Sequence, residues 1–134
     1  QGLVKAFQDL GKAIEDDIQT GKDIGDNVQK AIDTLEKAGD KVDKVELQKE
    51  EAKDQANYVA KRFAVKEAVS KALGTGFSEG ITWKDIELEH LGSGQPYTVL
   101  HGKAKKKLEA YGAEGIYISL SDEAGLVTAF AVLS

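Results

Sequence analysis

Cysteine and methionine are absent from this chain of 134 residues, and proline occurs only once. Without cysteine, the chain has no disulfide framework, no thiolate zinc site and no cysteine nucleophile. Methionine is missing even at position 1, from which we expect a processed piece of a longer protein. No run approaches the ~20 apolar residues of a membrane span, so we expect no stable membrane insertion.

A strong excess of one charge is also lacking, with 18 Lys and Arg against 23 Asp and Glu. This balance is not typical of a general nucleic-acid-binding protein, which is strongly basic. The one basic run is the set of four lysines within residues 103–107, and such a run is usually a solvated helix face. The composition, 41% hydrophobic and 31% charged, is that of a folded soluble chain.

Residues 3–73 carry the pattern of successive helices. Apolar residues recur every three or four positions, for example at Leu3, Phe7 and Leu10, and form one narrow stripe between charged residues. Glycines at 21, 25 and 39 predict bends, because glycine weakens a helix interior by about 1 kcal/mol. We interpret residues 1–56 as a helical entry or linker segment and residues 57–134 as an α+β domain.

The helix that opens the second segment has a broader apolar face, and Gly74 is well placed as its C-terminal cap. Such a face predicts packing against a sheet. After Gly74 the pattern changes, since six of the 14 glycines lie between residues 74 and 102. Thr82 and Asp85 resemble a capping box. The pattern of residues 83–91 fits either a short helix or a strand.

The remainder predicts short strands and one helix. Residues 97–100 form a strand, residues 103–111 a helix, and residues 116–120 a strand with clean alternation. Residues 122–125 are typical of a hairpin turn. Residues 127–133 are continuously apolar, which favours a central strand. The predicted fold class is α+β: an N-terminal helical segment followed by a small twisted antiparallel sheet packed on helices.

Motifs for common chemistries are missing. There is no Walker loop, no Gly-x-Gly-x-x-Gly and no Gly-x-Ser-x-Gly nucleophile elbow. Glu87, Glu89, His90 and His101 have metal-ligating atoms, but their spacing matches no recognised set. We therefore predict no metal and no cofactor.

Metal-free RNA cleavage needs few residues and remains possible for this sequence. One group removes the proton of the ribose 2′-hydroxyl, another protonates the leaving oxygen, and a cation or hydroxyl stabilises the phosphorane. Histidine suits both proton transfers because its ordinary pKa is ~6.5. We predict convergence of the catalytic residues His90, His101 and Thr128. The predicted substrate-binding residues are Lys103, Lys105, Tyr117 and Ser119.

Each of these residues also has a purely structural interpretation. His90 is in phase with Ile86 and fits a half-buried packing position. Thr128 is a common type of strand residue. Tyr117 fits an aromatic on a sheet surface.

Residues 118–130, Ile-Ser-Leu-Ser-Asp-Glu-Ala-Gly-Leu-Val-Thr-Ala-Phe, resemble the closing hairpin of bacterial polymorphic toxin domains. Those domains are similar to the barnase–EndoU–colicin–RelE superfamily of ribonucleases. The resemblance implies a toxin of contact-dependent inhibition that cleaves RNA, with tRNA a candidate substrate. It also implies a cognate immunity protein as partner, secretion by the producing bacterium, and action in the target-cell cytoplasm. A family histidine maps onto His90 or His101, and a phosphate-binding hydroxyl onto Thr128.

Two further hypotheses stay open from the residues alone. The acidic balance and the lack of a strong motif favour a non-enzymatic binding module, such as an immunity or adaptor protein. The helices at the N-terminus favour an assembly segment of a larger secreted protein.

Overall fold

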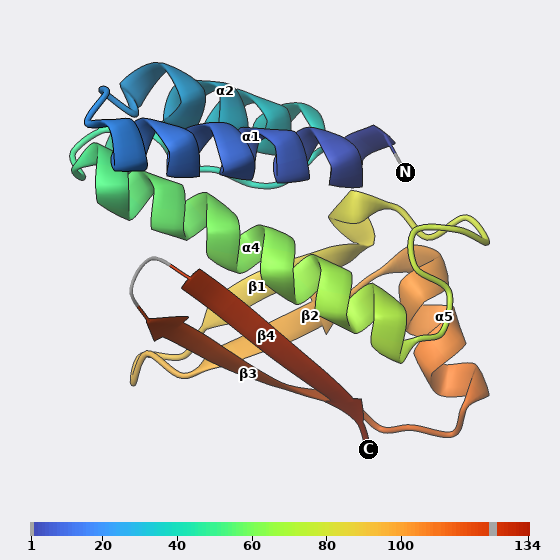
Figure 1. The fold of residues 1–134 in the computed structure, drawn as a ribbon. Helices are drawn as coiled ribbons and strands as arrows, with labels where there is room; N and C mark the ends of the chain where they lie inside the picture. The colour runs from blue at the N-terminus through green and yellow to red at the C-terminus, as the bar shows by residue number, and fades with distance from the viewer. Residues whose placement is uncertain (1, 124–125) are drawn as a thin grey trace. The chain divides into compact units, whose positions relative to one another are not determined.

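The structure, a computed structural model, describes residues 2–123 and 126–134. The chain divides into two compact units, Gln1–Ala60 and Lys61–Ser134 (Figure 1). Helices make up the described part of the first unit, and helices and antiparallel strands make up the second. The predicted α+β class is therefore confirmed. Our division of the chain at residue 56 stays a prediction.

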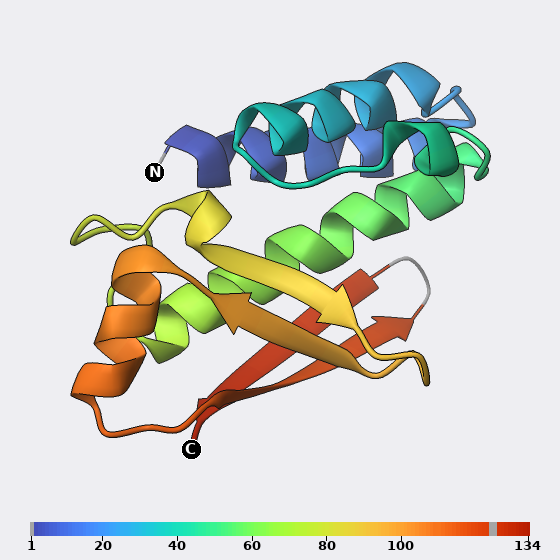
Figure 2. The same cartoon turned by 180° about the vertical axis from the view of Figure 1, so that it is seen from behind.

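The first unit contains α1 (Gly2–Thr20), α2 (Gly25–Lys37), the short α3 (Lys44–Leu47) and the beginning of α4 (Ala52–Ala72). Helices α1 and α2 pack side by side, as both views show (Figures 1 and 2). The predicted bends are confirmed, because Gly21 and Gly39 follow these two helices with positive φ angles of 73° and 95°. Gly11, by contrast, lies inside α1.

The second unit adds a 3₁₀ turn, η1 (Trp83–Asp85), one helix and four strands to the end of α4. The helix is α5 (Gly102–Ala110), and the strands are β1 (Ile86–His90), β2 (Pro96–Leu100), β3 (Ile116–Glu123) and β4 (Leu126–Leu133). Strand β1 pairs with β2 and β3 with β4, both antiparallel, so the strands form two ladders. Residues 86–90 are thus a strand after a 3₁₀ turn. The predicted turn at 122–125 includes residues 124 and 125, which lie outside the described residues.

The expectation that residues 127–133 form a central strand was wrong. Strand β4 pairs only with β3, and two of its large apolar side chains, Phe130 and Val132, are exposed. The alternate residues Ala129, Ala131 and Leu133 pack against the core. The apolar run therefore reflects one buried face and one exposed apolar face, not burial on both sides.

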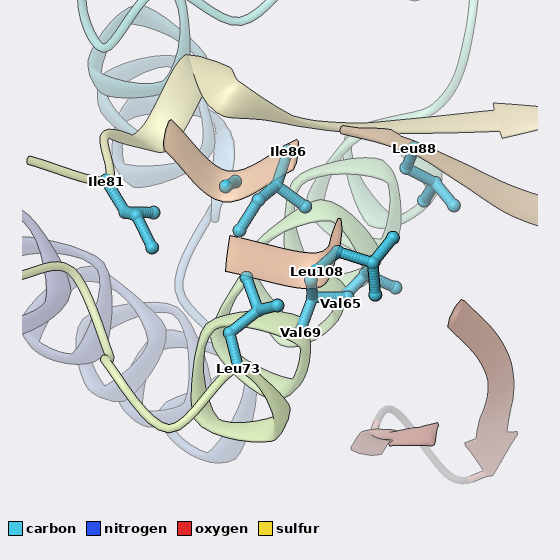
Figure 3. Packing of buried hydrophobic residues seen from close by; sticks show 8 residues of the cluster. Val65, Val69, Leu73, Ile81, Ile86, Leu88 and Leu108 are labelled. Carbon is cyan, nitrogen blue, oxygen red and sulfur yellow. The ribbon is translucent and has the colours of Figure 1, made fainter. Parts of the chain in front are cut away.

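The core of the second unit lies between α4 and the strands (Figure 3). Val65, Val69 and Leu73 recur every four residues on α4, so they share one face of the helix. Ile86 and Leu88 of β1 pack into the same cluster, since alternate strand residues point to one side. Each such buried side chain contributes about 1.5–3 kcal/mol of hydrophobic stabilisation. This cluster fixes which face of α4 remains available for other roles.

A buried lysine joins α4 to η1. The side chain of Lys66 is fully buried, and its Nζ donates to the carbonyl oxygen of Trp83 at 2.8 Å. The same ammonium lies 5.4 Å from the centre of the Trp83 ring, which also stacks on Phe63. A buried ammonium is costly unless it is hydrogen-bonded, so this contact ties Trp83 to one place on the helix.

We expect Lys66→Ala to destabilise the second unit by about 2–4 kcal/mol, because it removes buried methylenes and leaves a buried carbonyl without this donor. Trp83 is the only tryptophan, so its fluorescence during urea unfolding measures the effect. Lys71→Ala, on an exposed lysine of the same helix, is the control and should change stability by less than about 0.5 kcal/mol. Equal unfolding midpoints for the two variants would contradict a structural role for Lys66.

Candidate functional site

The last two turns of α4 carry polar groups beside its apolar face. Glu67 and Lys71 are four residues apart and form an ion pair of 3.9 Å, with relative side-chain exposures of 26% and 72%. Ser70 is buried, and its Oγ donates to the carbonyl oxygen of Glu67. One end of α4 therefore presents a half-buried carboxylate next to an exposed ammonium.

Residues 74–80, named here the glycine loop, follow α4 directly. Gly74 has a φ of 78°, which ends the helix, and the backbone N–H groups of Thr75 and Gly76 both donate to the carbonyl oxygen of Ser70. This arrangement confirms Gly74 as the C-terminal cap. Glu79 is the only described non-glycine residue with a positive φ, at 57°, and Gly80 follows at 80°. Left-handed backbone at a non-glycine residue is a strained state that often marks functional loops.

Further groups gather where β2 meets α5. His101 Nε2 lies 2.5 Å from an Oε2 of Glu87, across the β1–β2 ladder. Asp85 caps η1 by accepting from the backbone N–H of Thr82 at 2.9 Å, as the sequence predicted. The side chain of Lys103 lies on the glycine loop, because a Cβ built on Gly80 would be 2.7 Å from its Nζ. Lys103 thus brings the start of α5 against the glycine loop, which directly follows α4.

The structure does not bring the two histidines together. His90 pairs with Pro96 at one end of the β1–β2 ladder, whereas His101 follows Leu100, which pairs with Ile86 at the other end. Those ends are four residue steps apart along the strand, a distance of about 13 Å. His90 and His101 therefore do not share one anion-sized pocket.

The remaining predicted site residues fall in two places. Tyr117, Ser119 and Thr128 are exposed and share the outer face of the β3–β4 ladder, where Ser119 pairs with Phe130 and Thr128 with Ser121. Lys103 and Lys105 are exposed near the start of α5, beside His101. The predicted substrate-binding residues are thus split between a sheet face and a helix.

Among residues 2–123 and 126–134, no three His, Asp or Glu side chains lie close enough together to hold a metal ion. In the same part of the chain, every helix falls short of the length and apolar character that a membrane crossing requires.

A profile of the 4′-phosphopantetheinyl transferase superfamily matches residues 17–130, most of the chain. The chain belongs to this superfamily. A holo-[acyl-carrier-protein] synthase from Xanthobacter autotrophicus is 46% identical over 89 residues, which cover 63% of this chain and 66% of that protein. The match spans 61–66% of the length of the first three curated relatives.

Solved structures agree with this assignment to the superfamily. A holo-acyl-carrier-protein synthase from Plasmodium yoelii has a TM-score of 0.62 and 34% identity, over 79% of this chain and 80% of that one. The Helicobacter pylori enzyme in complex with coenzyme A has a TM-score of 0.57 and 25% identity, over 75% of this chain and 84% of that one. These matches cover a larger share of the chain than the second unit alone.

Membership of this superfamily overturns the functional expectations drawn from residues 118–130. The resemblance to polymorphic toxins was wrong, and so were RNA cleavage, the RNA and immunity-protein partners, and secretion into a target cell. The alternative of an immunity or adaptor module was also wrong. The physical reason is that an alternating hairpin pattern with Asp and Gly between its strands suits many α+β folds and specifies none of them.

Sequence reasoning missed Glu67 and Lys71. It treated residues 58–73 only as an apolar helix that packs on a sheet. The available signal was the charged pair Lys66 and Glu67 inside that apolar helix, followed by Gly-Thr-Gly at 74–76. A buried charge in a packing helix needs a partner or a function, and a glycine-rich turn lets a ligand approach the backbone.

The pKa of His90 is lowered from 6.5, mainly by burial and further by the positive charges of Arg62 and Lys61, while Glu89 opposes the shift. The unfolded chain therefore binds the proton more tightly than the folded chain. We expect the contribution of His90 to the free energy of unfolding to be full above pH ~6.5. It should fall as the pH drops through the lower pKa that His90 has in the folded chain. Arg62→Gln should raise the pKa of His90, measured by NMR titration of the ring protons. An unchanged or lower value in that variant would contradict this explanation.

Proposed function

We propose that this chain transfers the 4′-phosphopantetheinyl group of coenzyme A to an acyl carrier protein. The superfamily match over residues 17–130 is the observation that carries the proposal. It is supported by curated relatives that are holo-[acyl-carrier-protein] synthases and by a structural relative in complex with coenzyme A. The end of α4 with the glycine loop supplies the types of group that this reaction uses.

The reaction is a phosphoryl-type transfer from a diphosphate donor. A hydroxyl oxygen of the carrier protein forms a bond to the phosphorus that bears pantetheine. The bond from that phosphorus to the bridging oxygen of the diphosphate breaks, and adenosine 3′,5′-bisphosphate leaves with the electron pair. The hydroxyl proton must go to a base, and the negative charge on the phosphate oxygens needs cations or N–H donors.

Glu67 is the proposed base. Its side chain is partly buried, and the adjacent residue on α4, Lys66, is fixed by its contact with Trp83. This anchored backbone holds the carboxylate in a defined place, which general-base catalysis requires. Among the described residues Lys71 forms an ion pair with Glu67 alone, and this pair is long. Its ammonium can therefore move to a phosphate while it stays near the base.

Lys103 and the glycine loop are proposed to hold the donor phosphates. No described side chain forms an ion pair or hydrogen bond with Lys103, whose ammonium lies on Gly80. Nothing in the described residues accepts from the backbone N–H groups of Ser78, Glu79 or Gly80. Consecutive free N–H groups beside an ammonium are a suitable environment for phosphate. Of the predicted site residues, Lys103 is the one that we keep in this proposal.

We expect Glu67→Gln to lower kcat for transfer by about 10²–10⁴-fold, because the amide cannot accept the proton. Purified chain, apo acyl carrier protein and coenzyme A are incubated with and without Mg²⁺, which diphosphate ligands commonly carry. Mass spectrometry then measures the modified carrier protein.

The control variant is Glu89→Gln, on an exposed glutamate of β1, which should keep parental activity. An inactive parent under both conditions overturns the proposed function, and full activity of Glu67→Gln overturns the role of Glu67.

Lys103→Ala should raise the KM for coenzyme A about 5–30-fold and leave kcat nearly unchanged, because it removes a charge-assisted contact with the donor. The matched control is Lys106→Ala, an exposed lysine on the same helix. Equal KM values for these two variants would contradict a specific contact by Lys103.

A further inference from the structure

Helix α5 contacts both ends of the glycine loop. At the first end, Tyr111, which follows α5, donates its Oη hydrogen to the carbonyl oxygen of Leu73 at 2.8 Å. The last carbonyls of a helix have no partner within the helix, so this bond satisfies one that α4 leaves open. At the second end, Lys107 Nζ lies 3.4 Å from Oε1 of Glu79.

The two contacts are coupled through one pair of side chains. Lys107 and Tyr111 are four residues apart, and the Lys107 ammonium lies 5.5 Å from the centre of the Tyr111 ring. At this distance the ammonium is attracted to the face of the ring by a cation–π interaction. The ring that binds Leu73 therefore also orients the ammonium that binds Glu79.

The glycine loop needs outside support in its second half. The carbonyl oxygen of Ser70, on α4, accepts from Thr75 and Gly76, and Ser78 Oγ donates to the carbonyl oxygen of Thr75. The ring of Phe77 packs against that of Trp83. Glu79 has a left-handed backbone, which is strained for a residue with a Cβ. The contact with Lys107 acts on this strained residue, next to the free N–H groups of Ser78, Glu79 and Gly80.

We propose that Tyr111 and Lys107 are positioning residues that hold the glycine loop in the conformation that binds the donor phosphates. Neither residue touches the reacting atoms; both act through the backbone of Leu73 and Glu79. The inference rests on the proposed function, because the loop has this role only if coenzyme A is the donor. The contacts from α5 order the loop before coenzyme A binds. The free energy of ordering the loop is then not lost from the binding of coenzyme A.

The test compares Tyr111→Phe, which removes only the hydroxyl, and Lys107→Ala with the parent. Each should raise the KM for coenzyme A about 5–20-fold, as expected for the loss of one such contact, and change kcat and the KM for the carrier protein less than two-fold. Amide hydrogen exchange of Gly76 and Ile81, whose N–H groups donate to the carbonyl oxygens of Ser70 and Ser78, should become faster in both variants. Lys107→Arg, which keeps the charge, should restore the KM, and Lys106→Ala should resemble the parent.

Two failures are distinguishable. A parent that transfers no phosphopantetheinyl group overturns the proposed function and this inference with it. A parent that is active, with Tyr111→Phe and Lys107→Ala equal to it in both the KM for coenzyme A and loop exchange, overturns the inference alone. Faster exchange with an unchanged KM also overturns it, because the loop would then be supported by α5 without the donor depending on it.

Discussion

The packing of one face of α4 against β1 is the constraint on which the second unit depends. Val65, Val69 and Leu73 occupy the same cluster as Ile86 and Leu88, and the cluster is almost free of solvent (Figure 3). A helix has 3.6 residues per turn, so once this face is fixed, the direction of every other side chain on α4 is fixed too. Glu67 and Lys71 lie outside the apolar face for that reason. The hydrophobic core thus determines where the charged pair emerges.

Lys66 adds directional control that apolar packing alone does not give. Hydrophobic contacts tolerate small rotations of a helix, whereas the hydrogen bond from Lys66 to the Trp83 carbonyl requires one geometry. The ring of Trp83 between Phe63 and Phe77 fills the space around it. A buried polar contact of this kind contributes little net stability, but it selects one arrangement among several of similar apolar burial.

The predictions from sequence succeeded where the local pattern decides the structure. The α+β class, the cap at Gly74 and the bond between Thr82 and Asp85 all follow from short-range chemistry. The prediction that β4 is a central strand was wrong, because an apolar run has the same pattern whether both faces are buried or one is left exposed. The separation of the two histidines has a different origin. His90 and His101 are the usual acid–base residues, but nothing local shows that the register of β1 and β2 places them at opposite ends. The same limit applies to Glu67, whose setting depends on Trp83, a residue 16 positions away in the chain.

The free energies of the separate contacts show that the glycine loop is held by several of them together. An exposed ion pair such as Lys107 with Glu79 contributes about 0–1 kcal/mol, which is not enough by itself to offset the left-handed backbone of Glu79. The Tyr111 hydroxyl adds about 0.5–1.5 kcal/mol at the other end, and the ring contact with Lys107 reduces the side-chain entropy that the ion pair would otherwise lose. Only the combination approaches the cost of the strained residue. A bound phosphate that accepts from the free N–H groups of the loop would stabilise this ordered conformation further.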